Sequence, residues 1–184
     1  MKPHVSENFD PKFLEAVQIV IDLQEMIMGI TNENIDETFE NLLTLENSCN
    51  QQAFHFFQEG EFQKFIKSTL LTAAHYRPLH LSALAQLTGK LFLRFEELKP
   101  SLLNLPLRIV ESPWQLALLF ECYDANIISE DDVMNMLNYY KTHYSKMDGS
   151  LMLIFQYFHL VFKKKDPEFY EQSFNFLIQH KLRY

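Results

Sequence analysis

The sequence predicts an all-α protein of eight or nine helices, joined as antiparallel hairpins in an α-solenoid-like stack or an irregular helical bundle. Among its 184 residues only four are glycines, and no run alternates apolar and polar residues between tight turns, as strands require. Seventeen phenylalanines and an apolar fraction of 47% supply the surface that packed helices bury. Apolar residues recur at spacings of three and four between short links, which place consecutive helices antiparallel.

The spacing of the helices is compatible with both the stack and the bundle. About four hairpins of roughly 40 residues match the repeat length of helical arrays, which favours the solenoid. No shift in composition marks a boundary, so we expect one domain over residues 1–184, with residues 1–9 flexible.

The first two helices are marked by caps. Asp10-Pro11 gives a cap and a first-turn proline, and Gly29 follows the last apolar residue, so the first helix is predicted over Pro11 to Met28. Its expected core face comprises Phe13, Leu14, Val17, Val20, Ile21 and Met28. A second helix is predicted to start near Thr31–Asn34 and to bury Ile35, Phe39, Leu42 and Leu43.

The middle of the chain is divided by Gly60, Pro78 and Pro100. Asn50 is predicted to cap a separate segment that ends at Gly60, and the next helix covers residues 61–76. Pro78 then starts a helix that we expect to reach Leu98, just before Pro100. Its buried edge is predicted to be Leu84, Leu87, Leu91 and Phe95.

The remaining helices have similar signals. Residues 101–111 contain Pro106 and are predicted as a short helix or an irregular connector. Ser112-Pro113 starts a helix for which Asn126 is a left-handed stop, and Ser129 to Asp132 forms a capping-box-like start for a helix to about His143. Two more helices are predicted over residues 150–165 and after Asp166-Pro167.

The stretch RPLHLSA, which begins at Arg77, nearly matches the ankyrin signature T-P-L-H-x-A-A. An ankyrin repeat ends its first helix at a glycine a few residues later, whereas the next glycine here is the distant Gly89. No second copy occurs 33 residues upstream or downstream, and a single repeat cannot bury its own faces. Pro78 in the first turn of one longer helix explains the same letters, so an ankyrin repeat is not predicted.

A wider resemblance covers about residues 60–165. HYRPLHLSALAQLTGKL is followed by a proline-broken connector, LALLFECYDANIISEDDVMNML and FQYFHLVF. This order resembles the helical segment that precedes the repeats in large ankyrin-repeat proteins of trichomonad-type protists. The resemblance implies a helical interaction module without catalysis, although no ankyrin repeats follow within these 184 residues.

A second resemblance involves Leu119–Ser129, where a helix ends in a Tyr-x-x-x-Ile-Ile-Ser step. This stretch is similar to the middle domain of translation initiation factor 4G, which is a stack of helical hairpins. The basic surfaces of that domain are missing here, which argues against RNA binding.

Charge and cysteine content restrict the classes of partner and the cellular location that we expect for this protein. The net charge is −8, and residues 1–60 hold eleven acidic residues against two lysines, so we expect no nucleic-acid binding there. Cys49 and Cys122 have no CxxC spacing and are predicted to be reduced, buried and inert. The longest apolar run, residues 151–162, is shorter than the ~20 residues of a membrane span. These features predict a soluble, cytoplasmic protein that does not enter membranes.

No pattern indicates catalysis or a cofactor. His75 and His80 are separated by Pro78, no HExxH is present, and neither cysteine has a histidine three or four residues away, so no metal site is predicted. The acidic pairs are neighbours in sequence and point to different sides of a helix, and neither GxxxxGKS nor GxGxxG occurs. We therefore expect a protein that is not an enzyme.

Exposed aromatic residues are better candidates for a functional site than any catalytic or metal-binding pattern in the sequence. Trp114 follows a proline cap, where an indole either packs as a staple or projects as a binding anchor. Tyr140 and Tyr144 share a helix face beside lysines and would accept a peptide or stack on a base, or else cap a packing seam. The sequence thus predicts a non-catalytic scaffold or adaptor that binds other proteins; a helical-repeat RNA- or translation-associated factor is the alternative.

Overall fold

The computed structural model describes residues 11–51, 60–104, 112–133, 135–136, 167–168 and 171. Within these ranges the chain is helical and contains no strand, which confirms the all-α prediction. The elements are α1 Pro11–Met28, α2 Ile35–Gln51, α3 Glu61–Tyr76, the 3-10 turn η1 Pro78–His80, α4 Leu81–Arg94, α5 Leu98–Leu103 and α6 Ser112–Asp124.

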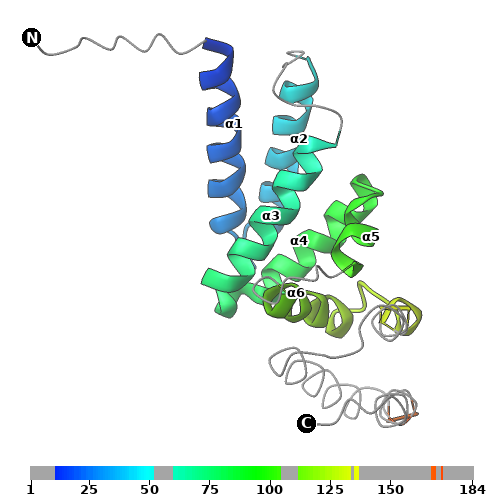
Figure 1. Ribbon diagram of the computed structural model, residues 1–184. Helices are drawn as coiled ribbons and strands as arrows, with labels where there is room; N and C mark the ends of the chain where they lie inside the picture. The colour runs from blue at the N-terminus through cyan, green and yellow to red at the C-terminus, as the bar shows by residue number, and fades with distance from the viewer. Residues whose placement is uncertain are drawn as a thin grey trace, which may run out of the picture.

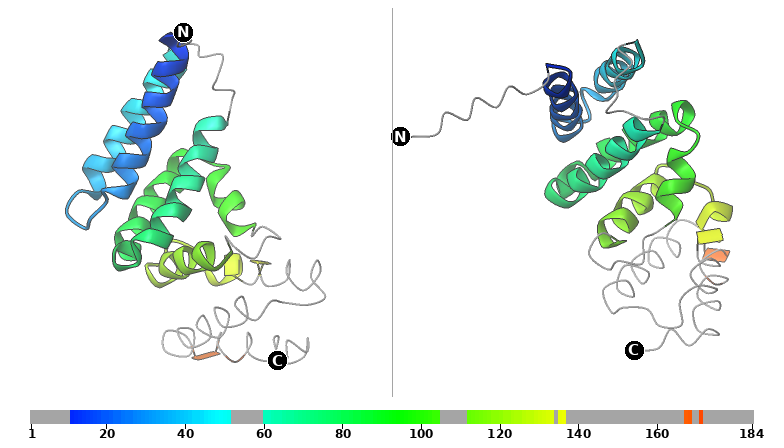
Figure 2. Two further views of the ribbon diagram at one scale, coloured as in Figure 1. Left: turned by 60° about the vertical axis from the view of Figure 1, so that its left-hand side comes forward. Right: turned by 45° about the horizontal axis from the view of Figure 1, so that its top comes forward.

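The labelled helices lie in successive layers. Helices α1 and α2 form one hairpin and α3 and α4 form the next, with α1 packed on α3 and α2 packed on α4 (Figure 1). Helix α6 packs against both α3 and α4, on the side of this second hairpin away from α1 and α2 (Figure 2). The short α5 contacts α3, α4 and α6.

The core is a continuous set of aliphatic side chains between these layers. The predicted edge of α4 is confirmed, since Leu84, Leu87 and Leu91 are fully buried and Phe95 is 3% exposed. Across the α2–α4 contact, Lys90 pairs with Asp36 at 2.7 Å and Arg94 pairs with Glu46 at 2.9 Å. Part of the acidic charge of α2 therefore serves to pair with α4.

The bounds of α1 are as predicted, but its predicted core face is wrong. The buried residues are Ala16, Ile19, Leu23 and Ile27. By contrast Phe13, Leu14, Val17 and Ile21 are 39%, 53%, 38% and 40% exposed, and Val20 and Met28 are half-buried. This helix is apolar on two sides, and a helical period does not say which side meets α2 and α3.

The link between α1 and α2 is organised by Asn34. Its side-chain oxygen accepts a hydrogen bond from the Thr31 amide at 2.7 Å, and its amide group donates to the Gly29 carbonyl at 3.1 Å. The Thr38 amide then donates to the Asn34 carbonyl at 2.8 Å, as the first bond of α2. The predicted start of α2 is confirmed, and α2 continues through Asn50 to Gln51; residues 52–59 of the segment that Asn50 is predicted to cap lie outside the described residues.

The helix predicted from Pro78 to Leu98 is not continuous, because the chain leaves the helix between α4 and α5. Pro78 opens η1, which leads directly into α4; α4 ends at Arg94, because Phe95 takes an extended conformation with φ −118° and ψ 95°. Pro100 lies in the first turn of α5 instead of beyond a helix end. A first-turn proline is tolerated because the amides of that turn have no partner within the helix.

Gly89 lies inside α4, at the position where this helix contacts the segment that follows α6. A Cβ atom built on Gly89 would lie 3.1–3.2 Å from three side-chain carbons of Ile127. Asn126 has a φ of 59°, which confirms the predicted left-handed stop and turns Ile127 towards α4.

The predicted capping box is also confirmed. Ser129 donates to the carboxylate of Asp132 through its amide at 2.8 Å and its hydroxyl at 3.0 Å. The Asp132 amide in turn donates to the Ser129 hydroxyl at 3.2 Å. None of the helices in the described ranges combines the length and the apolar character that crossing a bilayer would need; the apolar run 151–162 lies outside those ranges.

Candidate functional site

Of the three predicted partner-binding residues, the structure describes Trp114. It lies in the first turn of α6, half-buried against the core. Tyr140 and Tyr144 lie outside the described residues, as does the lysine run 163–165. The candidate site is therefore built around Trp114.

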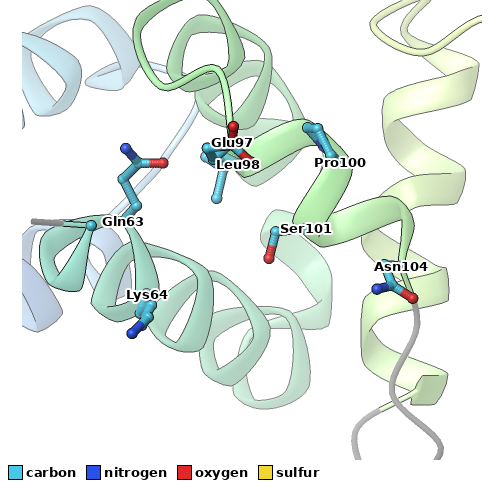
Figure 3. Close-up of a pocket in the computed structure, with 8 residues that line it drawn as sticks. Gln63, Lys64, Glu97, Leu98, Pro100, Ser101 and Asn104 are labelled. Atoms are coloured by element: carbon cyan, nitrogen blue, oxygen red, sulfur yellow. The ribbon is translucent and has the colours of Figure 1, made fainter.

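Two hollows run along one side of α3 and meet at Lys64 and Ser101, which line both. The first has a volume of about 500 Å³ and is shown in Figure 3, between the start of α3 and helix α5. The second, of about 510 Å³, extends to Trp114. We call these two adjoining hollows, from Gly60 to Tyr76, the α3 groove.

Helix α3 supplies one wall of this groove because it has two distinct faces. One face is buried against the neighbouring helices and comprises Phe62, Ile66, Thr69, Leu70, Ala73 and Ala74. The groove face carries Lys64, Ser68, Leu71 and His75, at helical spacings of four, three and four. One wall of the groove is therefore a helix whose opposite face is buried, and it presents cationic, hydroxyl, apolar and aromatic groups to the groove.

The opposite wall, formed by α5, is held in place by two long side chains. Lys67 crosses from α3 and donates to the Ser101 carbonyl at 2.7 Å. The buried Gln115 of α6 donates its side-chain amide to the carbonyl of Leu102, with a longer contact of 3.5 Å to Asn104. These bonds satisfy carbonyls at the end of α5, which have no partner inside so short a helix.

Three aromatic rings form a column at the far end of the groove. The imidazole of His75 lies 4.2 Å from the Trp114 ring, at 8°, and 4.5 Å from the Tyr76 ring, at 11°. Two rings this close and this parallel to the imidazole cannot both fit on one of its sides, so His75 lies between them. Trp114 closes the inner end of the column, and Tyr76, 69% exposed, forms its outer end.

The charge along the groove is uneven. Among the residues that the structure describes, the hollow beside Trp114 is lined by Lys64 and Lys67 and by no carboxylate. Lys64 pairs with Glu61 at 2.9 Å, but with 74% of the Lys64 side chain exposed, such a surface pair adds little stability. The other hollow contains Glu97. The end of the groove nearest the ring column is therefore its more positive part.

Nucleophilic chemistry finds no support at the two cysteines. Burial, together with the nearby Glu46, raises the pKa of the Cys49 thiol to about 11. Burial, together with Glu121, raises the pKa of Cys122 to about 12. A thiol with so high a pKa carries almost no thiolate at neutral pH, so both residues behave as small apolar groups of the core. Over the part of the chain that the structure describes, no three His, Cys, Asp or Glu residues gather as metal ligands would.

Sequence reasoning found Trp114 but missed the other parts of the groove. His75 drew attention only as a metal ligand, and Tyr76 and Lys64 were not candidates. The available signal was the second stripe of α3, where polar and aromatic residues keep the helical period of the core face. The ring contact between His75 and Trp114 joins residues 39 positions apart, and a pattern read over neighbouring residues contains no information about such a contact.

Comparison of the chain with protein-family models, with curated proteins and with solved structures finds no match.

Proposed function

We propose that this protein is a non-catalytic helical module that binds other proteins, and that the α3 groove holds an extended, acidic segment of its partner. The observation that carries the proposal is the ring column of Trp114, His75 and Tyr76 at the lysine-lined end of the groove. A scaffold or adaptor in the cytoplasm is the role that we assign to it.

The ring column suits this role because its outer part is open while its inner part is supported. Trp114 packs against the core, so its position is held by α6. Aromatic rings of this kind offer a large contact area at little loss of side-chain freedom, which is why they dominate binding hot spots. A partner side chain that packs against the column would be held by the inner rings.

The length and charge of the groove indicate the ligand. Helix α3 has 16 residues and is about 24 Å long, a distance that roughly seven residues of extended peptide would span. Lys64 and Lys67 favour carboxylates near the column, and the hydroxyls of Ser68 and Thr72 in the same hollow offer hydrogen bonds. An extended peptide with acidic residues next to an apolar or aromatic residue fits these features.

The arrangement of the hairpins supports the same role. In our proposal the stacking of α1 on α3 and of α2 on α4 is the beginning of an α-solenoid-like array, the kind of scaffold that presents extended binding surfaces. The resemblance of residues 60–165 to the helical segment that precedes ankyrin arrays points to an interaction module as well.

An RNA-binding role is the alternative, since bases also stack on aromatic columns beside lysines. The acidic first hairpin argues against it: residues 11–51 contain eight carboxylates and a single basic side chain, Lys12. A phosphate backbone would be repelled along this side of the molecule.

The experiment uses the only tryptophan of the chain as its reporter. Peptides of about ten residues, long enough to cover the groove, are selected from a displayed library against the full chain. We expect the selected peptides to be acidic and to change Trp114 emission when they bind.

His75→Ala removes the middle ring from an exposed position and should weaken these peptides at least about tenfold, or 1.4 kcal/mol. His80→Ala, at a residue that lines neither hollow, is the matched control and should leave affinity within about twofold. Equal affinities in the two variants would contradict the proposal. Salt-sensitive binding of single-stranded RNA that His75→Ala abolishes would assign the groove to the alternative.

A further inference from the structure

Helix α1 has an apolar face that the described fold leaves exposed. Leu14, Val17 and Ile21, at spacings of three and four, are 53%, 38% and 40% exposed. Four of the seven large hydrophobic residues that are exposed in the described ranges belong to this one helix. We call Leu14, Val17 and Ile21 the α1 stripe.

The position of α1 makes this stripe accessible. Helices α2 and α3 contact the side of α1 that carries Ala16, Ile19, Leu23 and Ile27, and α1 lies at one end of the stack of hairpins (Figures 1 and 2). The end helix of a helical array normally presents a polar outer face, because nothing covers it. An apolar outer face at this position indicates that another element packs there.

A line of polar residues runs along one edge of the stripe. Glu15, Asp22 and Glu25 fall on this edge, together with Gln18, whose amide donates to Asp22 at 2.6 Å. Lys12, at the start of α1, is the one basic side chain of this hairpin, and residues 13–51, which include the edge, contain none. The basic residues of α4 that pair with this hairpin reach Asp36 and Glu46 on α2. The α1 stripe is therefore an apolar surface with a negative border.

The negative border of the α1 stripe determines which kind of molecule can bind there. A second copy of the chain would bring its own carboxylates to the same interface, and like charges in a buried contact are unfavourable. Anionic lipid headgroups would be repelled for the same reason. A helix with an apolar face and a border of Lys or Arg satisfies both the stripe and its acidic edge, as in helix-in-groove recognition.

We infer that the α1 stripe is a second binding surface, separate from the α3 groove, and that it takes a basic amphipathic helix of a partner protein. The helix lies along α1 as a further layer of the stack. Its leucine-like residues cover Leu14, Val17 and Ile21, and its cations lie beside Asp22 and Glu25.

The test measures binding of designed peptides to the full chain by fluorescence anisotropy. The probe is a labelled helical peptide of about 18 residues, or five turns, with Leu at i, i+3, i+4 and i+7 and Lys on the flanks. A second peptide keeps the leucines and carries Glu in place of Lys, and a third has the composition of the probe in a scrambled order. We expect only the first to bind, with an affinity that falls as salt is raised.

Variants then locate the binding site. The double variant Leu14→Gln, Ile21→Gln should weaken the probe at least about tenfold, whereas Leu93→Gln, at a leucine on α4 that is 89% exposed, should change it less than about twofold. Asp22→Asn with Glu25→Gln should weaken it about three- to tenfold, and Glu40→Gln on α2 less than about twofold. Circular dichroism verifies that each variant keeps its helix content; the charge variants test the site even if the apolar double variant does not fold.

Three results would overturn the inference. The first is equal binding of the Lys and Glu peptides, and the second is equal affinity in the stripe variants and in their matched controls. The third is a concentration-dependent dimer in sedimentation experiments that Leu14→Gln, Ile21→Gln abolishes, because the stripe would then belong to a second copy of the chain.

Discussion

At the scale of single residues, Gly89 shows how one missing side chain sets the distance between helix α4 and the segment that follows α6. Three carbons of Ile127 occupy the space where a Cβ atom would lie. Glycine inside a helix lowers its stability by about 1 kcal/mol relative to alanine, so this residue is unfavourable for α4 alone. The close approach of Ile127, which packs on the core, gives the reason for its presence.

We predict that Gly89→Ala destabilises the protein by about 1 kcal/mol, because the overpacking against Ile127 outweighs the gain in helix propensity. The same change in an Ile127→Ala background should instead stabilise by up to about 1 kcal/mol, since the clash is gone. Urea unfolding of the four proteins in this cycle measures both values. A stabilising effect of Gly89→Ala in the wild-type background would show that Ile127 moves away without loss.

At the scale of an element, the helix that begins at Ser129 depends on its capping box. Burial alone would raise the pKa of Asp132, but hydrogen bonds from the Ser129 amide, from Lys99 and from the Ser129 hydroxyl outweigh it, and the pKa is lowered. Lys99 reaches the same carboxylate at 2.9 Å, so α5 and this helix start are joined through one residue.

We predict that Asp132→Asn destabilises the protein by about 1 kcal/mol at neutral pH, because an amide keeps an acceptor oxygen but loses the charge that strengthens the bonds to Ser129 and Lys99. The pKa of Asp132 is lower in the folded state than in the unfolded state, so its contribution is present above the unfolded value of about 3.9. It is lost as the pH falls through the lower, folded value. The difference between wild type and variant, measured by urea unfolding at pH 7 and in acid, should therefore shrink in acid.

Asp131→Asn is the matched control for this prediction. It changes the neighbouring carboxylate, which is exposed and outside the capping box, and should alter stability by less than about 0.5 kcal/mol. Equal effects of the two variants at neutral pH would mean that net charge, and not the cap, accounts for the result.

At the scale of the whole molecule, the two cysteines report on different layers of the structure. Cys49 is 7% exposed in α2, in the first hairpin, and Cys122 is fully buried in α6. In the solenoid-like stack that we propose, each layer is stabilised mainly by its neighbours, so the first hairpin should open more easily than α6, which contacts α3, α4 and α5.

We predict that neither thiol reacts readily with a disulfide reagent at pH 8 in the native protein, because their pKa values of about 11 and about 12 leave little thiolate. As urea is added, Cys49 should be labelled before Cys122, since α2 lies in the end hairpin. Mass spectrometry of peptides after timed labelling distinguishes the two residues. Simultaneous labelling at every urea concentration would show that the molecule unfolds as one unit, as a closed bundle does.

The interface between α2 and α4 is another feature that appears only at this scale. Counted along the chain, the acidic residues of the first third look like a solvated, repulsive surface. In the folded protein Asp36 and Glu46 meet Lys90 and Arg94, and Lys90 also lies 5.6 Å from the Phe39 ring. The carboxylates on the α1 edge belong to the other helix of this hairpin, so one hairpin has both a paired and an outward-facing acidic side.

The sequence by itself determined the features that depend on neighbours within a turn or two of helix. These include the all-α class, the bounds of α1, the start of α2 at Asn34, the left-handed Asn126 and the capping box at Ser129. Each is decided by backbone hydrogen bonds or by a φ angle that a few adjacent residues control, so the local pattern is sufficient.

Only the tertiary structure decided which of two apolar faces a helix buries and where distant side chains meet. The period of α1 fits two faces equally well, and contact with α2 and α3 selects the one that contains Ile19 and Leu23. The break after Arg94 and the meeting of His75 with Trp114 likewise depend on how helices far apart in the chain pack together. Packing energy is summed over such long-range contacts, and a pattern read over one helix contains no information about them.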